Sequence, residues 1–411
     1  LGELAKKAAD NKDPAKAADY RARADALLQS LADRAQEDAQ LSKALGAAYL
    51  GSDDPVKAEH FLRRAVEMKT DDIESHLELS KALSRLNRID DALEQLKSAQ
   101  QLDPTRPDIA LEIARTYEDA KRDDDASAAY KKLLDAKDPP IQARVRAGRF
   151  LARRKEIKAA AAQGDVILKA EPENPAGHYL KGEGLLADGK LDDARKELTI
   201  AVDGDPDPQY LDAQGRAAEA SVAASGDTKY YDLALRAYER AIAAAPEMFN
   251  PQAGTGRIYI ARKEWTKAVT PLLAANRLDK TDADVMYDIG LAYKNMAQPK
   301  VAAEWLQQAT TKKRDADTYY QLALLYLDAN SASAEGALRE ATHLAQEKET
   351  KQGVKVDWLT DAYYKLAQTE YGLHNLAGAK SAYESYLGRN PPPGAALDEA
   401  RRLLSTELRG Q

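Results

Sequence analysis

The strongest constraint on this chain is an alanine that recurs every 34 residues. After one longer interval of 40 residues the 34-residue spacing returns, so that the series runs Ala58, Ala92, Ala126, Ala160, Ala194, Ala234, Ala268 and Ala302. A period of this length is typical of a chain that repeats one small supersecondary unit. The spacing therefore predicts a stack of units that contact only their neighbours, rather than a domain with one central core.

Each unit contains two apolar runs at helical spacing, followed in many units by a proline. In residues 73–106 the first run contains Leu79 and Leu83, and the second contains Leu93 and Leu96. A small residue twelve positions before seven of these eight alanines lets the two helices approach closely, while bulky neighbours fill the space between them. Proline ends the second helix because it cannot donate the next backbone hydrogen bond.

This register resembles that of the tetratricopeptide repeat family, and the match is best at 73–106, 175–208, 249–282 and 283–316. The resemblance implies an all-α fold, a right-handed superhelical solenoid of antiparallel helix pairs. It covers about 355 of the 411 residues in ten units: 39–72, 73–106, 107–140, 141–174, 175–208, 209–248, 249–282, 283–316, 317–359 and 360–393. Three units depart from the pattern. Gly164 replaces an aromatic residue in one, 209–248 has extra residues, and the second helix of 317–359 aligns in two ways.

The two ends differ from the repeats. Residues 1–38 are expected to form an N-terminal capping helix or a partial repeat, with Asp13 and Pro14 starting a helix. Residues 394–411 are expected to form a C-terminal solvating helix, since the last apolar face of an array needs a polar-backed cover. Because the chain begins at Leu1 without a hydrophobic leader, a trimmed or processed N-terminus is expected.

Composition and charge argue against several classes of function. The net charge of −7 argues against general nucleic-acid binding, and no apolar run is long enough to insert into a membrane. The chain has no cysteine, which is compatible with either the bacterial cytoplasm or the periplasm. The histidines lack metal-ligand spacing, the glycine pairs lie within predicted helices, and the paired carboxylates fall at helix starts where they serve as caps. We therefore predict no catalytic residue, no cofactor and no metal site.

The resemblance implies that a partner binds in a concave groove lined by positions 2, 5, 9, 12 and 13 of each unit. In the N-terminal half these positions carry the cations Lys43, Lys81, Arg85, Arg115, Arg149 and Arg153. Three successive units place a cation at position 9, which favours an acidic peptide segment as the partner. The asparagines of the family's carboxylate clamp for chaperone tails are missing here.

In the C-terminal half the groove positions are richer in tyrosine. The candidates there are Tyr179, Arg257, Tyr287, Tyr364 and Tyr371. Tyrosine is favoured at protein interfaces because it combines a flat apolar ring with a polar tip. Each ring could instead pack between neighbouring helices, and the sequence leaves that choice open.

Three hypotheses about function follow. The leading one is a non-catalytic protein–protein interaction scaffold of a bacterial multiprotein assembly, with a partner segment in the groove. The second is a periplasmic arm of an envelope or polysaccharide-export machine. The third is the substrate-docking repeat region of a larger enzyme.

Overall fold

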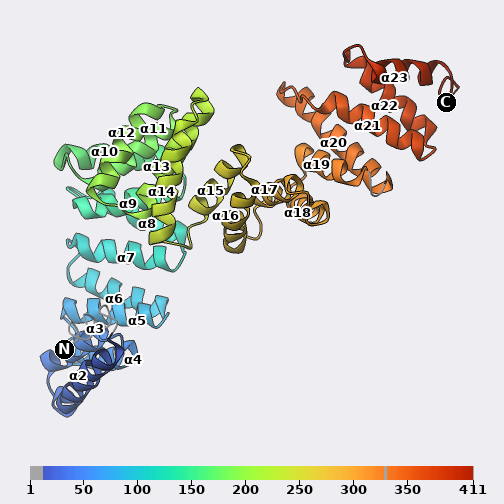
Figure 1. Ribbon diagram of the computed structural model, residues 1–411. Coiled ribbons are helices and arrows are strands. Elements are labelled where there is room, and N and C mark those ends of the chain that lie inside the picture. Colours follow the sequence, from blue (N-terminus) through green and yellow to red (C-terminus); the bar gives the residue numbers. More distant parts are fainter. Residues whose placement is uncertain (1–12, 328–330, 411) are drawn as a thin grey trace. The chain divides into compact units, whose positions relative to one another are not determined.

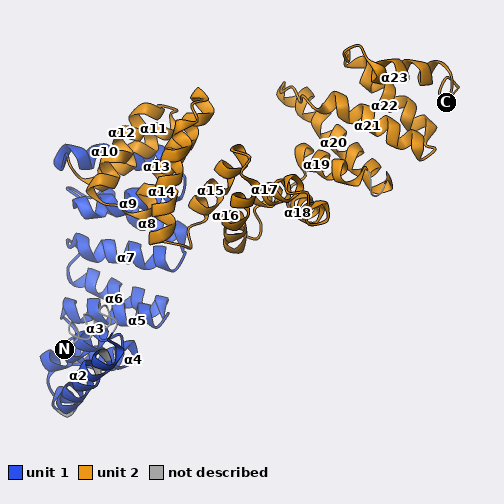
Figure 2. Ribbon diagram, in the orientation of Figure 1, with its two compact units in different colours: residues 1–172 blue, residues 173–411 orange. Residues whose placement is uncertain are grey.

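The computed structural model describes residues 13–327 and 331–410, and the regular structure within them is α-helical. Helix contacts divide the chain into two compact units, Leu1–Pro172 and Glu173–Gln411 (Figure 2). We call them unit 1 and unit 2 and describe each by itself. The first twelve residues of the expected N-terminal segment, residues 328–330 and Gln411 lie outside the described residues.

In unit 1 the helices follow one another with short turns (Figure 1). They are α2 (Pro14–Ala35), α3 (Ala39–Gly51), α4 (Pro55–Met68), α5 (Ile73–Arg85), α6 (Ile89–Leu102), α7 (Pro107–Asp119), α8 (Asp123–Leu134), α9 (Ile141–Arg153) and α10 (Ile157–Ala170).

Unit 2 continues the same alternation and contains the two longest helical pairs. Its helices are α11 (Pro175–Ala187), α12 (Leu191–Gly204), α13 (Pro208–Ser225), α14 (Lys229–Ala244), α15 (Phe249–Ala261), α16 (Trp265–Leu278), α17 (Ala283–Asn295), α18 (Pro299–Lys312), α19 (Ala316–Tyr326), α20 (Ser331–Gln352), α21 (Leu359–Gly372), α22 (Leu376–Gly388) and α23 (Ala395–Ser405).

The helices pack as consecutive pairs, from α3 with α4 to α21 with α22, and these pairs are consistent with roughly ten repeats. The recurring alanines lie at the contacts within the pairs. Each of the eight alanines from Ala58 to Ala302 in this series is fully buried. A Cβ atom added at Gly182 or Gly290 would lie 2.7 Å from the side chain of Leu198 or Leu306 on the paired helix. Close approach of the two backbones therefore requires a glycine at these positions.

The turn inside most pairs contains one residue with a left-handed backbone. Its φ is 62° at Asp53, 58° at Asn87, 57° at Lys121 and 57° at Ala297, and 72° at Gly189. Most residues avoid this region because the Cβ crowds the following carbonyl oxygen. The repeat thus imposes the same turn on residues of very different preference.

Two of the units that depart from the repeat pattern have lengthened helices. The extra residues of 209–248 extend α13 to Ser225, after which Gly226 adopts a left-handed φ of 71°. The charged stretch 345–357 continues α20 to Gln352. Glu349 near its end accepts a hydrogen bond from the Val356 backbone N–H and two from Arg389, at 2.8, 2.7 and 2.8 Å. These contacts tie the extended helix to the end of α22.

Helix α23 covers the last pair. Its buried Leu403, together with Leu408 beyond its end, belongs to a cluster with Tyr383 and Tyr386 of α22. Among the described residues, no helix is both long and apolar enough to cross a membrane.

Candidate protein-binding face

First helices of successive pairs contact one another in both units. Helix α3 contacts α5 in unit 1, and α11, α13, α15 and α17 contact one another in succession in unit 2. We call the surface made by these helices the first-helix face; it comprises α3, α5, α7 and α9 in unit 1, and α11, α13, α15, α17, α19 and α21 in unit 2. Residues far apart in the sequence therefore share one surface in each unit.

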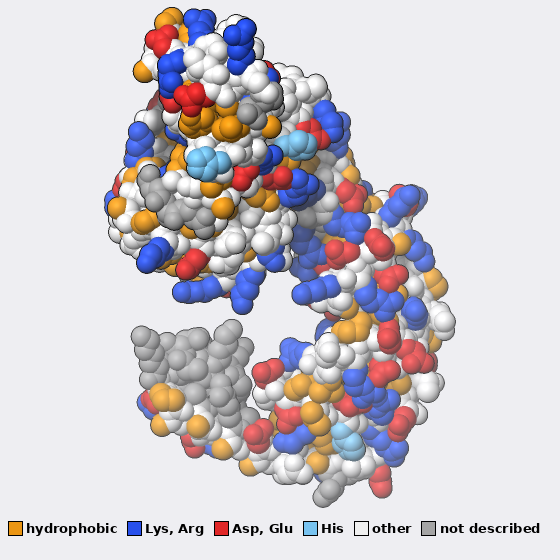
Figure 3. Space-filling view, turned by 90° about the vertical axis from the view of Figure 1, so that its right-hand side faces the viewer, with side chains coloured by type: hydrophobic (Ala, Val, Ile, Leu, Met, Phe, Trp, Pro, Cys, Tyr) orange, Lys and Arg blue, Asp and Glu red, His pale blue; other side chains and the backbone are white. Residues whose placement is uncertain are grey.

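Three predicted cations of unit 1 form ion pairs with nearby carboxylates. Lys43 Nζ lies 2.9 Å from the Asp72 carboxylate, Lys81 Nζ lies 2.7 Å from Glu78, and an Arg115 nitrogen lies 3.1 Å from Glu112. Lys81 and Arg115 pair with a residue three positions earlier on the same helix. In Figure 3 basic and acidic side chains are likewise interspersed over the visible face.

The other three predicted cations lie on α5 and α9. Arg85 donates a hydrogen bond of 2.6 Å to the Leu50 carbonyl at the end of α3, and it lies 3.6 Å from Asp53. Arg149 is half-buried on α9. Arg153 lies 3.3 Å from Glu118 and 3.4 Å from Asp123.

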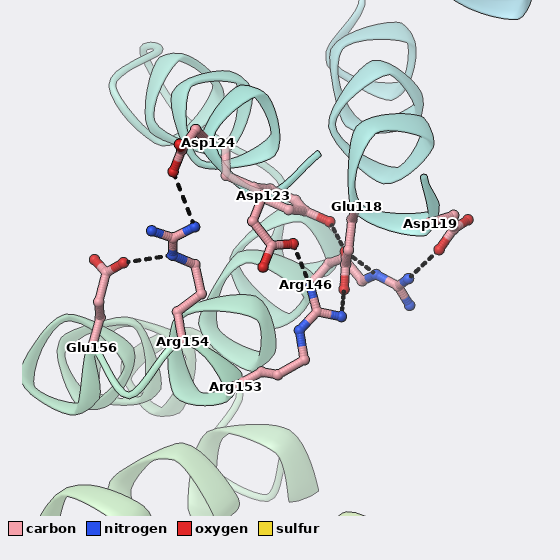
Figure 4. A network of polar contacts seen from close by, with 9 residues as sticks. Glu118, Asp119, Asp123, Asp124, Arg146, Arg153, Arg154 and Glu156 are labelled. Atoms are coloured by element: carbon pink, nitrogen blue, oxygen red, sulfur yellow. Dashed lines mark hydrogen bonds and ion pairs between the residues drawn. The ribbon is translucent and has the colours of Figure 1, made fainter. Parts of the chain in front are cut away.

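Glu118 is the centre of the network in Figure 4, where side chains of α9 reach toward α7 and the start of α8. Its carboxylate accepts hydrogen bonds from Tyr130 at 2.5 Å and from Arg146 at 3.1 Å, and it also faces Arg153. Burial and this carboxylate both raise the pKa of Tyr130. The network joins three successive helices and holds Arg146 and Arg153 of α9 against Glu118.

The predicted residues of unit 2 have different environments. Tyr179 is 6% exposed and stacks on Tyr210 with ring centres 4.6 Å apart. Tyr287 is half-buried, and burial raises its pKa to about 12. Arg257 lies 3.2 Å from Glu219. Tyr179 is thus packed between helices, whereas Tyr287 and Arg257 reach the first-helix face.

The two C-terminal tyrosines contact the covering segment at the end of the chain. The hydroxyl of Tyr364 donates to Glu399 of α23, and that of Tyr371 donates to Glu407. Both rings are half-buried. They connect α21 to the segment that closes the stack.

Sequence reasoning missed a charged network in unit 2. Its members are Glu183 of α11, Asp212, Arg216 and Glu219 of α13, Arg257 of α15 and Asp288 of α17. The spacing of Asp212 and Arg216, four residues apart on one helix, is the signal that could have indicated it. The expected unit starts at residue 209, whereas α13 begins at Pro208, so Asp212, Arg216 and Glu219 fell outside the expected groove positions.

In the described part of the chain no group of three or more histidines or carboxylates could hold a metal ion. His76, which is 6% exposed, contacts Gln95 at 2.9 Å and the Thr70 carbonyl at 3.0 Å. His178 contacts Glu197 at 2.6 Å. Both rings connect the helices of a pair.

Comparison with protein families gives three matches, all to models described as the tetratricopeptide repeat. They cover residues 83–149, 229–283 and 283–314. Together with the stacked helix pairs, these matches identify the chain as a tetratricopeptide-repeat protein, a class that generally mediates protein–protein interaction. No curated protein is significantly similar in sequence.

Several solved structures have a related arrangement of helices. A tetratricopeptide repeat protein from Parabacteroides merdae is 16% identical with a TM-score of 0.49, over 62% of this chain and 98% of that one. The C-terminal part of a repeat protein from Cytophaga hutchinsonii is 16% identical with a TM-score of 0.48, over 62% and 98%. Pseudomonas aeruginosa pilF is 18% identical with a TM-score of 0.43, over 56% and 96%.

Proposed function

We propose that this protein is a non-catalytic scaffold that holds a segment of a partner protein on its first-helix face. The observation that carries the proposal is the succession of contacts between first helices, from α11 to α17 in unit 2. It brings exposed and half-buried polar and aromatic side chains from many repeats onto one surface. A surface of this kind suits an extended or helical segment, which gains affinity by contacting several repeats at once.

Site-specific photocrosslinking tests this proposal. A photoreactive amino acid would replace Lys81 or Gln368, two exposed residues of first helices, and for comparison Lys97 or Glu304, two exposed residues of second helices. Mass spectrometry would identify the crosslinked protein after capture from cells. We expect one partner to crosslink from the first-helix positions only. Equal crosslinking from the second-helix positions would contradict the proposal.

The cations of unit 1 are the part of this face that we propose for an acidic partner segment. The ion pairs of Lys81 and Arg115 do not prevent such a contact, because exposed pairs contribute only about 0.2–1 kcal/mol each. An incoming carboxylate can therefore exchange with Glu78 or Glu112. Changing Lys81, Arg115 and Arg149 together to glutamate should weaken partner binding and reduce its salt dependence. Unchanged affinity and salt dependence would count against the acidic segment.

A bacterial multiprotein assembly is the setting that we propose for this scaffold. Ala, Asp and Arg are frequent in the sequence, as in proteins of GC-rich bacterial genomes. The crosslinking experiment addresses the setting directly, since the captured partner reveals the assembly to which it belongs.

A further inference from the structure

The charged network of unit 2 runs across four successive first helices. Arg216 of α13 bonds Glu183 of α11 and also Asp212 on its own helix, the latter at 2.9 Å. One turn further along α13, Glu219 lies 3.2 Å from Arg257 of α15. Arg257 in turn attracts the carboxyl group of Asp288 on α17. Charges of alternating sign thus follow the first-helix face from α11 to α17.

The network contains more negative than positive groups. Four carboxyl groups, those of Glu183, Asp212, Glu219 and Asp288, face the two guanidinium groups of Arg216 and Arg257. Glu183 and Asp212 form the buried end of the network. The side chains of Glu183 and Asp212 are only 6% and 8% exposed, and Asp212 Oδ1 is buried without a hydrogen-bond partner. The excess of negative charge is therefore not cancelled from within.

Asp288 differs from the other three carboxyl groups of the network in its bonding. Its side chain is half-buried, and within residues 13–327 and 331–410 its carboxyl group has no hydrogen bond or ion pair at contact distance. The neighbouring first helices are connected by such bonds: Glu219 to Arg257 between α13 and α15, and Lys294 to Gln321, at 2.5 Å, between α17 and α19. Among the described residues no such bond connects α15 with α17, and the carboxyl group of Asp288 on α17 accepts none.

We propose that the first-helix face of unit 2 binds its partner through a lysine or arginine side chain that contacts Asp288 and completes the charged network. This inference rests on the proposed function and specifies the chemistry of the partner. A partner cation would supply the hydrogen bonds that Asp288 lacks and offset the excess negative charge. Charge-assisted hydrogen bonds of this kind are the strong ones in protein recognition.

The protonation of Asp288 supports this chemistry. Burial raises its pKa to about 7; Arg257 opposes the shift, while Asp284, Asp282 and Glu219 add to it. Tyr287 lies next to it on α17, and Asp315 and Asp317 face that tyrosine from the α19 side. A cation binds the ionised form, so affinity should increase as the pH rises from 6 to 8.

The experiment measures binding of a defined probe by fluorescence anisotropy. The probe is a rhodamine-labelled peptide of alternating lysine and alanine, and a peptide of alternating glutamate and alanine is the charge control. Asp288→Asn removes the proposed contact. Glu304→Gln makes the same change of charge on α18, where Glu304 is exposed. All proteins are measured at pH 6 and pH 8 at one ionic strength, after circular dichroism has shown equal helix content.

We expect Asp288→Asn to weaken binding of the lysine peptide about tenfold at pH 8, and Glu304→Gln to weaken it less than about twofold. Only the Asp288 variant should lose the pH dependence. Equal effects of the two variants, absent binding of the lysine peptide or preferential binding of the glutamate peptide would overturn the inference. Crosslinking separates it from the proposed function: a partner that crosslinks to the first-helix face and ignores Asp288→Asn leaves the scaffold intact and refutes the cationic contact.

Discussion

At the scale of single residues, a tyrosine, a glutamate and an arginine meet in the same way at two places. Tyr130 and Arg146 both bond Glu118 in unit 1. In unit 2, Tyr238 donates to Glu219 at 2.9 Å, and Arg257 lies 3.2 Å from the same carboxylate. In each case the tyrosine lies on a second helix and the arginine on the next first helix. The glutamate therefore connects one repeat to the following one.

Tyr130→Phe should destabilise the repeats around Glu118. The hydroxyl is buried and bonded to an ionised group, and such hydrogen bonds contribute about 1.5–3 kcal/mol. Hydrogen exchange of α7, α8 and α9 in the folded protein would measure the loss. Glu156→Gln removes the exposed pair with Arg154 and serves as the control, with an expected change below about 1 kcal/mol. Similar exchange in both variants would contradict the importance of the buried bond.

Asp288 should make stability depend on pH. Its pKa is about 7 in the folded protein against 3.8 as its ordinary value, so the folded state binds the proton more tightly. Between about pH 4 and pH 7 the folded state holds more protons than the unfolded state, and the free energy of unfolding should therefore fall as pH rises. Above pH 7 this contribution becomes constant. Urea unfolding of the wild type and Asp288→Asn at several pH values would show whether the difference between them follows this curve; a difference independent of pH would exclude it.

The charged residues of the first helices show what the sequence could and could not indicate. Positions 9 and 13 of the repeats predicted which cations lie on first helices, because helical spacing is local information. Helical spacing could not predict that Arg85 bonds the Leu50 carbonyl or that Arg153 contacts Glu118 and Asp123. Those choices depend on the distance between side chains of different helices, as well as on competition among several carboxylates. Asp288 was missed for the same reason.

At the scale of elements, the turn between paired helices is the most uniform feature of the array. Its left-handed residue is Gly189 in one repeat and Ala297 in another, with φ of 72° and 57°. Both positions are exposed, and no side chain packs on Gly189. These two turns therefore differ mainly in how readily their central residue, glycine or alanine, adopts a left-handed φ.

Ala297→Gly should stabilise the protein by about 0.5–1 kcal/mol. The substitution removes a left-handed penalty of about 1–2 kcal/mol and adds about 0.4–1 kcal/mol of unfolded-state entropy. Gly189→Ala should have the opposite effect by a similar amount. Thermal unfolding of both variants measures the two changes in stability. A loss of stability in Ala297→Gly would show that the left-handed backbone of Ala297 does not reduce the stability of the protein.

At the scale of the whole molecule, stability comes from neighbouring contacts rather than from one core. Buried clusters form separately along the chain, for example around Tyr49 and Phe61 in unit 1 and around Tyr383 and Leu403 in unit 2. In an array of this kind the total stability is approximately a sum over repeats and their interfaces. A change at one end should therefore act locally.

Removing residues 395–411 should expose the last pair without affecting distant repeats. Tyr383 and Tyr386 would lose their contacts with Leu403 and Leu408. We expect faster hydrogen exchange in α21 and α22, together with lower solubility, and unchanged exchange in α3 to α6. Faster exchange along the entire chain would contradict nearest-neighbour stability.

The sequence by itself determined the architecture of this protein, because a 34-residue register of small residues, bulky residues and turns is satisfied by one kind of helix pair. It also determined which helices carry the candidate face. Only the tertiary structure decided which charges on that face neutralise one another and which carboxyl group is left with an open acceptor. Those outcomes depend on burial and on distances between repeats, and a local periodic pattern contains neither.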